Sequence, residues 1–180
     1  IISFKQMKKT DLKHNLRIKK PMIDSTVFIA KGAQVIGDIV LNPYSSIWYN
    51  SVLRADINDI IIGSRSNIQD NCTLHLENNQ GILIGNDVTI GHNVILHGCT
   101  IGDGALIGMG SIIMNGVKIG RGATVGAGAV IMENITIPDY CVVVGVPGKI
   151  IKKQTEKAYT ENVKWAQKYV KLAALHKDQI

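Results

Sequence analysis

Three of the five histidines in this chain are spaced so that they could share a metal ion: His75, His92 and His97. Neutral imidazole is a common ligand of zinc and other divalent transition metals. Three such ligands leave one coordination position for solvent or substrate, which is the arrangement of a catalytic metal centre rather than a structural one. The prediction holds only if the fold brings the three side chains together.

The chain is organised by an aliphatic residue that returns at every sixth position. From Ile101 to Val143 the spacing is unbroken, commonly with Gly next and a small residue four places on. A period of six fits neither an amphipathic helix nor a simple half-buried strand, and it is typical of a parallel β-helix. We therefore predict an all-β, single-stranded parallel β-helix of about seven coils with three faces each over residues 23–150.

The two ends of the chain differ from the repeat. Residues 1–22 are a basic lead-in, with one strand expected near residues 16–18. The segment Gly145–Lys149 should end the coil, because Pro and Gly favour a turn. Residues 151–180 are predicted to pack back on the coil as one amphipathic helix, over about 151–177. Its apolar stripe contains Val163, Ala166, Val170 and Ala173, extended by Tyr159, Trp165, Tyr169 and Leu172.

Insertions in the repeat decide which residues stack. One column of the coil should be formed by leucines that are one 18-residue coil apart plus insertions of three and four residues: Leu53, Leu74 and Leu96. Arg54, His75 and His97 each follow one of these leucines by one place. We therefore expect them on one outer edge, with neighbours roughly 4.8 Å apart, the spacing of adjacent strands.

His92 belongs to a different column. It lies two residues after Ile90, and the same count places it above Asp70. It cannot easily reach His75 and His97 within one chain, but it can if three coils pack around a threefold axis. We therefore predict a homotrimer with one divalent metal at each subunit interface, held by His75 and His97 of one chain and His92 of the next.

The chain resembles the gamma-class carbonic anhydrases, in their branch with a short acidic loop. The matching segments are Arg54-Ala55-Asp56, Asn67 to Cys72, His75, Ile90-Gly91-His92 and His97 to Gly102, within a likeness over about residues 20–175. The resemblance implies a left-handed β-helix trimer with Zn²⁺ as the metal, or Fe²⁺ or Co²⁺. It also implies reversible hydration of CO₂ to bicarbonate by metal-bound hydroxide.

The resemblance also implies roles for several polar residues. Gln69 would lie near the metal-bound solvent, and Arg54 would pair with Asp70 across the subunit boundary. Asp56 and Asp70 would support Gln69 and the interface, although purely structural ion pairs are equally compatible with them. Tyr169 matches a tyrosine that short-loop relatives place near the metal, and ordinary helix packing is the alternative.

The residues that would carry a proton away from the metal differ from those of the well-characterised active members. Ile57 stands where those enzymes have a glutamate, and the loop of residues 77–81 is short, with Glu77 as its acid. We therefore expect weak CO₂ hydration. Two other functions fit the repeat: acyl transfer from acyl-CoA or an acyl carrier protein with one His as base, and a non-catalytic trimeric scaffold.

Composition limits the partners and the compartment. The formal charge of +6 comes largely from lysines near both ends, without the aromatic interleaving of a nucleic-acid surface. We see no signal peptide and no apolar run long enough for a membrane span, so the expected location is the cytoplasm and the expected partner is a small molecule. The cysteines, Cys72, Cys99 and Cys141, form no paired framework and are expected to be buried thiols.

Overall fold

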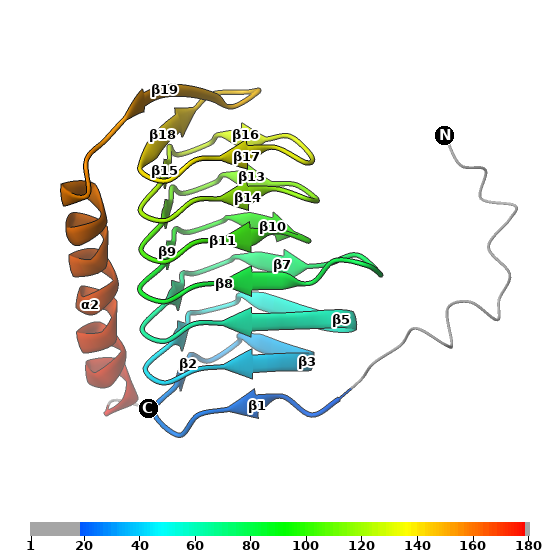
Figure 1. The fold of residues 1–180 in the computed structure, drawn as a ribbon. Helices are drawn as coiled ribbons and strands as arrows, with labels where there is room; N and C mark the ends of the chain where they lie inside the picture. Colours follow the sequence, from blue (N-terminus) through cyan, green and yellow to red (C-terminus); the bar gives the residue numbers. More distant parts are fainter. Residues whose placement is uncertain (1–18, 179–180) are drawn as a thin grey trace, which may run out of the picture.

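The hexapeptide pattern folds into a parallel β-solenoid with one helix along its side, as the sequence predicts (Figure 1). The structure is a computed structural model that describes residues 19–178. One sheet has eight strands, of which the last is antiparallel. The other seven strands (8 − 1) stack in parallel, one per coil, so the described residues form about seven turns. The strand expected near residues 16–18 lies outside the described residues.

The remaining two faces of the coil form one continuous eleven-stranded sheet, because two long strands bend around a corner of the coil. Its strands are β1 (Met22–Ile23), β3 (Gln34–Leu41), β5 (Val52–Ile62), β7 (Thr73–His75), β8 (Ile82–Ile84), β10 (Ile95–His97), β11 (Thr100–Ile101), β13 (Ile112–Ile113), β14 (Lys118–Ile119), β16 (Val130–Ile131) and β17 (Thr136–Ile137). The eight-stranded sheet contains β2 (Phe28–Ile29), β4 (Ser46–Ile47), β6 (Asn67–Ile68), β9 (Thr89–Ile90), β12 (Leu106–Ile107), β15 (Thr124–Val125), β18 (Cys141–Val144) and β19 (Lys149–Lys153).

The core is a stack of aliphatic side chains inside the coil. The predicted leucine column is confirmed, because Leu53 pairs with Leu74 and Leu74 with Leu96, and all three side chains are fully buried. The sixfold pattern is wrong for burial in the first turn, where Ile23 is 45% exposed and Ile29 is 37% exposed. The described residues place no coil beneath these two side chains, so only one side of each is covered.

The cysteines are buried and unpaired in the coil, as expected. Burial raises the pKa of the Cys72 and Cys99 thiols to about 12. A thiol with such a pKa stays protonated and unreactive at neutral pH. Neither thiol is therefore a candidate nucleophile.

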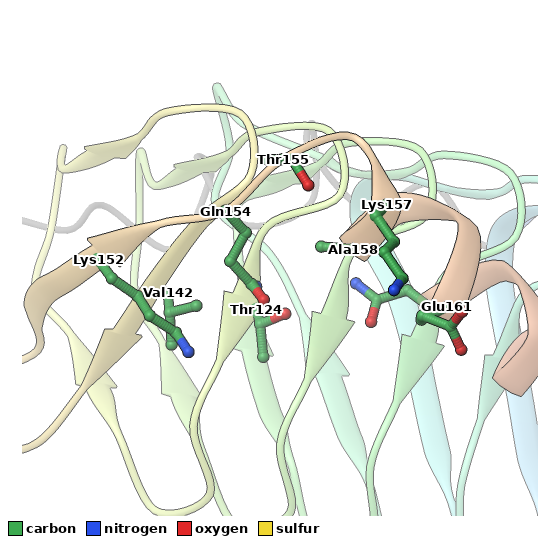
Figure 2. Close-up of a pocket in the computed structure, with 9 residues that line it drawn as sticks. Thr124, Val142, Lys152, Gln154, Thr155, Lys157, Ala158 and Glu161 are labelled. Atoms are coloured by element: carbon green, nitrogen blue, oxygen red, sulfur yellow. The ribbon is translucent and has the colours of Figure 1, made fainter.

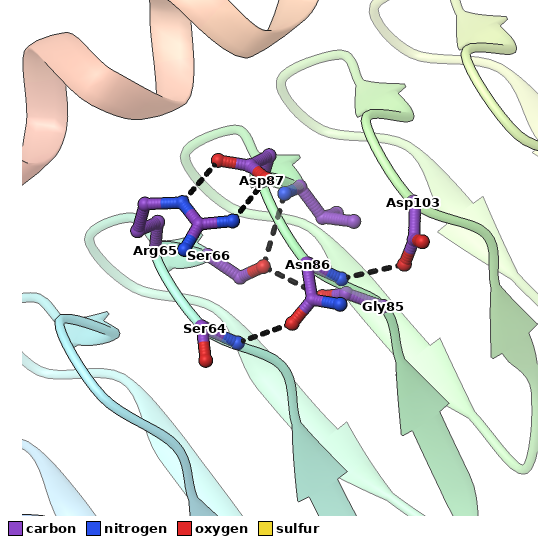
Figure 3. A network of polar contacts seen from close by, with 8 residues as sticks. Ser64, Arg65, Ser66, Gly85, Asn86, Asp87 and Asp103 are labelled. Atoms are coloured by element: carbon purple, nitrogen blue, oxygen red, sulfur yellow. Dashed lines mark hydrogen bonds and ion pairs between the residues drawn. The ribbon is translucent and has the colours of Figure 1, made fainter.

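Corner residues tie each coil to the next (Figure 3). Arg65 binds Asp87 one coil above it through two contacts, Nε to Oδ1 at 2.7 Å and Nη2 to Oδ2 at 2.6 Å. Asn86 Oδ1 accepts a hydrogen bond from the backbone N–H of Ser64, and Asp103 Oδ1 accepts one from that of Asn86. These stacked caps satisfy backbone donors at the bends. They also hold successive coils in register, which the candidate site requires.

The C-terminal helix begins later than the sequence pattern predicts. Helix α2 spans Lys157–Lys177, whereas residues 149–153 form β19, which pairs antiparallel with β18 after the predicted turn at Gly145. This pairing occupies the open edge of the last parallel strand, and its lysines face solvent. Helix α2 lies along the eight-stranded sheet, where Asn162 Nδ2 donates to the carbonyl of Gly104 at 3.0 Å. Within the described part of the chain, no helix has the length and apolarity that crossing a membrane requires.

Candidate metal centre

His75 and His97 lie side by side on adjacent coils. Strands β7 and β10 are in register at these residues, and the His75 Nδ1 and His97 Nε2 atoms are 3.1 Å apart. The register follows from the insertion between the two coils, which adds four residues to the regular eighteen and keeps Leu74 paired with Leu96. The structure therefore places two candidate ligands with facing ring nitrogens.

The outer nitrogens of these two rings both contact oxygen atoms that can accept a hydrogen bond. His75 Nε2 is 3.1 Å from Asp56 Oδ1, and His97 Nδ1 is 2.5 Å from Asn115 Oδ1. Ionised carboxylate and amide oxygens accept hydrogen bonds and do not donate them. These acceptors favour the tautomers in which each ring carries its proton on the outer nitrogen, and in those tautomers the two inner nitrogens face each other as lone pairs.

Asp56 is held in this position by Arg54 as well as by His75. Arg54 Nη1 donates to Asp56 Oδ2, so the carboxylate bridges the guanidinium and the imidazole. Burial by itself raises the pKa of Asp56, but the hydrogen bonds from Arg54 and His75 outweigh it and hold that pKa below its usual value. The carboxylate is therefore ionised at neutral pH and accepts from both partners.

Glu77 approaches the histidine pair through Asn115. The amide Nδ2 of Asn115 lies 3.4 Å from Glu77 Oε1, while the amide oxygen faces His97. Asn58 Nδ2 donates to the carbonyls of Glu77 and Asn78, which holds the short loop against the coil below. The predicted acid therefore touches neither histidine directly in the single chain.

His92 lies on a different edge, with Asp70 as its partner. Pairing of Ile68 with Ile90 puts Asp70 one coil below His92, and the His92 Nδ1 and Asp70 Oδ2 atoms are 2.8 Å apart. The carboxylate accepts the Nδ1 proton, so Nε2 of His92 remains available as a ligand or a base. Asp70 thus contacts His92 within the chain, while its predicted pairing with Arg54 across a boundary remains a prediction.

A cavity of about 430 Å³ brings His92 together with two other predicted site residues, Gln69 and Tyr169. The Gln69 amide nitrogen donates to Asn67 Oδ1 at 3.2 Å, and not to Asp56 or Asp70. Tyr169 comes from α2 and packs edge-on against Trp48, with ring centroids 5.3 Å apart. Burial, and to a lesser degree the negative charge of Asp70, raises the pKa of Tyr169, so its phenol remains a donor.

The predicted residues thus form two groups in one chain. We call them the histidine pair (His75 and His97, with Asp56 and Asn115) and the His92 half-site (His92 with Asp70, Gln69 and Tyr169). Among residues 19–178 of one chain, no three or more His, Cys, Asp or Glu side chains are arranged to hold a metal ion. The separation agrees with the different columns that the repeat assigns to His92 and to the other two histidines.

Sequence reasoning missed two polar residues of these groups, Asn115 and Asn67. Asn115 stands 18 residues after His97, but Leu96 pairs with Ile113, 17 residues later, so the repeat aligns His97 with Met114 and gave no signal for Asn115. Asn67 precedes Gln69 by two positions, and so lies on the same side of the chain in an extended segment. Its own Nδ2 donates to Thr89 Oγ1 at 3.1 Å, so the Gln69 amide ends a short polar ladder.

A second cavity, of about 420 Å³, lies between the last coils and the start of α2 (Figure 2). It is lined by Lys152 and Gln154 around β19 and by Lys157 and Glu161 on the helix. Its lining contains none of the predicted site residues. We therefore place the candidate chemistry at the two histidine groups.

Comparison with known proteins agrees with the repeat and finds relatives that are named as carbonic anhydrases. The model of the bacterial transferase hexapeptide family (six repeats) matches residues 81–115 and 98–133. A "Probable carbonic anhydrase" of Methanocaldococcus jannaschii is 51% identical over 152 residues, which are 84% of this chain and 96% of that protein. "Gamma carbonic anhydrase 2, mitochondrial" of Arabidopsis thaliana is 40% identical over 90% of this chain, and the match spans 60% of the plant protein's length.

Solved structures share the whole architecture. The crystal structure of a hexapeptide transferase family protein from Anaplasma phagocytophilum superposes with a TM-score of 0.81 at 38% identity. The match covers 86% of this chain and 91% of that one. The fold is therefore shared with a protein whose name refers to a transferase, while the curated sequence relatives are named for carbonic anhydrase.

Proposed function

Because the chain belongs to the gamma-class carbonic anhydrase-like family of hexapeptide-repeat proteins, we propose that it is a trimeric metalloenzyme that interconverts CO₂ and bicarbonate. The observation that carries the proposal is the approach of His75 Nδ1 and His97 Nε2 to 3.1 Å, with a hydrogen-bond acceptor on the other nitrogen of each ring. In the tautomers that these acceptors favour, both nitrogens present lone pairs, and a metal ion bound by both would remove their repulsion. Their separation is close to the roughly 3.3 Å expected between two nitrogens on one tetrahedral zinc ion.

The donor set fits a divalent metal in a second respect. Histidine ligands of metals usually donate their other ring nitrogen to a carboxylate or an amide oxygen, which fixes the tautomer. All three histidines do so here, to Asp56, Asn115 and Asp70. We assign Nδ1 of His75, Nε2 of His97 and Nε2 of His92 as the ligand atoms, with Zn²⁺ as the metal and Fe²⁺ or Co²⁺ as alternatives.

The position of the two groups favours a shared site in a trimer. His92 lies just before strand β10 and His97 is its last residue, so the two groups flank one face of the coil. Three copies that turn this face towards a threefold axis would bring the His92 half-site of one chain to the histidine pair of the next. Exposed apolar side chains support burial of this region, with Ile95 at the start of β10 and Met109 in the His92 cavity.

The chain's own residues would bind and orient the reactants. The metal would act as a Lewis acid that lowers the pKa of water, an effect for which carbonic anhydrase is the standard example. Gln69 donates through Nε2 to Asn67, so its Oε1 would be the atom that accepts a hydrogen bond from solvent or bicarbonate. Tyr169 would donate a hydrogen bond across the same cavity, since its raised pKa keeps the phenol protonated.

The test is metal analysis combined with CO₂ hydration. Protein purified anaerobically should contain about one divalent ion per chain, and supplying Zn²⁺ or Fe²⁺ to metal-free protein should restore hydration in a stopped-flow assay. His75→Ala should remove both the metal and the activity. Metal-free protein that forms an unchanged trimer and gains nothing from either ion would instead support the non-catalytic scaffold.

Acyl transfer is the second candidate, and the His92 cavity is the observation that favours it. The paired His92 and Asp70 have the geometry of a general base and its orienting carboxylate. The volume of about 430 Å³ lies in the range of pockets for drug-sized ligands and exceeds the needs of a three-atom substrate. A transferase needs only this histidine. Acetyl-CoA turnover that survives His75→Ala and is lost in His92→Ala would select it.

A further inference from the structure

We propose that Asn115 is a positioning residue of the metal centre: it fixes the tautomer of His97, and Glu77 fixes the orientation of Asn115. The inference rests on the proposed function, because it assigns a role to a neighbour of a ligand. It starts from the short contact of 2.5 Å between Asn115 Oδ1 and His97 Nδ1. An amide oxygen only accepts, so His97 Nδ1 must carry the proton and Nε2 must present its lone pair to the metal.

The orientation of the Asn115 amide is determined by its second contact. Its Nδ2 faces Glu77 Oε1 at 3.4 Å, so the nitrogen meets an acceptor while the oxygen meets the donor of His97. Turning the amide over would set its oxygen against the carboxylate of Glu77 and its N–H against His97 Nδ1. The carboxylate therefore selects the amide orientation that stabilises the ligand tautomer of His97.

The coil, rather than a surface loop, holds Asn115 in place. Its carbonyl accepts from the backbone N–H of Asn134 on the following coil at 2.8 Å, and the next residue, Gly116, donates to the Gly98 carbonyl at 2.9 Å. Asp56 and Asp70 reach His75 and His92 from the coil below, whereas Asn115 reaches His97 from the coil above. Each histidine is thus oriented by an acceptor on an adjacent coil.

The substitutions that test this role change the acceptor but keep the branched shape of the side chain. Asn115→Leu removes it, Asn115→Asp retains it with a charge, and Asn79→Leu makes the same change as Asn115→Leu at an exposed position of the nearby loop. Zinc affinity of each full-length protein would be measured by competition with a fluorescent chelator. We expect Asn115→Leu to lose about 10–100-fold in affinity, the usual loss for a partner of a metal ligand. Asn115→Asp and Asn79→Leu should bind at least as tightly as wild type.

A second measurement reads the tautomer directly and needs no metal. Long-range ¹H–¹⁵N NMR of the metal-free wild type should show His97 protonated on Nδ1, and Asn115→Leu should show a mixture of tautomers. Glu77 lies on the exposed loop, so Glu77→Ala should fold. It should change the zinc affinity and the His97 tautomer in the same direction as Asn115→Leu but by less. Glu77→Gln keeps an acceptor and should leave both unchanged.

The outcomes separate this inference from the proposed function. Wild-type protein that binds no zinc contradicts the proposed metal centre. In that case the NMR measurement of the His97 tautomer, which needs no metal, still tests the role of Asn115. Wild type that binds zinc, with unchanged affinity and tautomer in Asn115→Leu, overturns the role of Asn115 and leaves the metal centre standing. His97 protonated on Nε2 in the metal-free wild type overturns it as well.

Discussion

His75 Nδ1 and His97 Nε2 approach to 3.1 Å from adjacent coils because β7 and β10 are paired in register at these two residues. Hydrogen-bond acceptors occupy the opposite side of each ring. This arrangement suits the two-histidine part of the metal centre that we propose.

The first prediction is a homotrimer that depends on the face carrying β10. Ile95→Glu should produce monomers and abolish metal binding, because a charge would be buried without a partner where chains meet. Light scattering with metal analysis at micromolar concentration measures both. Leu83→Glu is the control, since Leu83 is similarly exposed but belongs to β8 on the next face. A wild-type monomer that retains its metal would rule out a shared site.

The second prediction concerns the division of the ligands between chains. His92→Ala should abolish metal binding although His75 and His97 remain, since two ligands seldom hold a labile divalent ion. Chains with His92→Ala mixed with chains lacking both His75 and His97 should form heterotrimers that regain one intact interface site each. Zinc content of tagged, purified heterotrimers measures this. If both variants fold and mix without regaining metal, the ligands do not complement across an interface.

The third prediction is slow CO₂ hydration limited by proton release. Ile57 packs against the core and has no titratable group, and Glu77 contacts Asn115 rather than a ligand. Positioned acid–base groups typically contribute 10²–10⁴-fold, so Ile57→Glu should raise turnover by about 10²-fold without a change in metal content. Ile57→Gln, of similar shape without a carboxylate, is the control.

High buffer concentration should accelerate the wild type more than Ile57→Glu, because small buffer molecules accept the proton directly. Stopped-flow rates over a series of buffer concentrations give the comparison. A wild type that is fast and insensitive to buffer would contradict the prediction. In that case Glu77→Gln and Tyr169→Phe would identify which residue carries the proton.

The fourth prediction concerns the docking of α2. Gly104 and Gly128 both have left-handed backbones (φ +61° and +68°), but a Cβ at Gly104 would lie 2.4 Å from the Tyr159 ring, whereas one at Gly128 would meet nothing within 4 Å. Substitution by Ala should cost about 1–2 kcal/mol at either position through the backbone. Gly104→Ala should destabilise further because Tyr159 must move, and Tyr159→Ala should remove this excess. Urea unfolding measures the differences, and equal losses at both glycines would contradict it.

Much of the site could be predicted from the sequence because a solenoid converts spacing along the chain into position in space. A six-residue period determines which side chains point inward, and the lengths of insertions determine which coils align. The stacking of His75 with His97 and of Asp70 with His92 followed from counting alone. The exposure of Ile23 and Ile29 in the first turn could not be predicted in this way, because their burial depends on a neighbouring coil that the period does not specify.

The tertiary structure alone decided which polar atoms touch. Between Leu96 and Ile101 the repeat loses one residue, and left-handed glycines at positions 98 and 116 shape the two stacked corners. The side chain that meets His97 is consequently Asn115, a contact that depends on corner conformation rather than on period. The start of α2 was decided in the same way, since residues 149–153 are drawn into β19 by the unpaired edge of β18. Local spacing carries no information about the hydrogen bonds that such an edge or corner leaves to be satisfied.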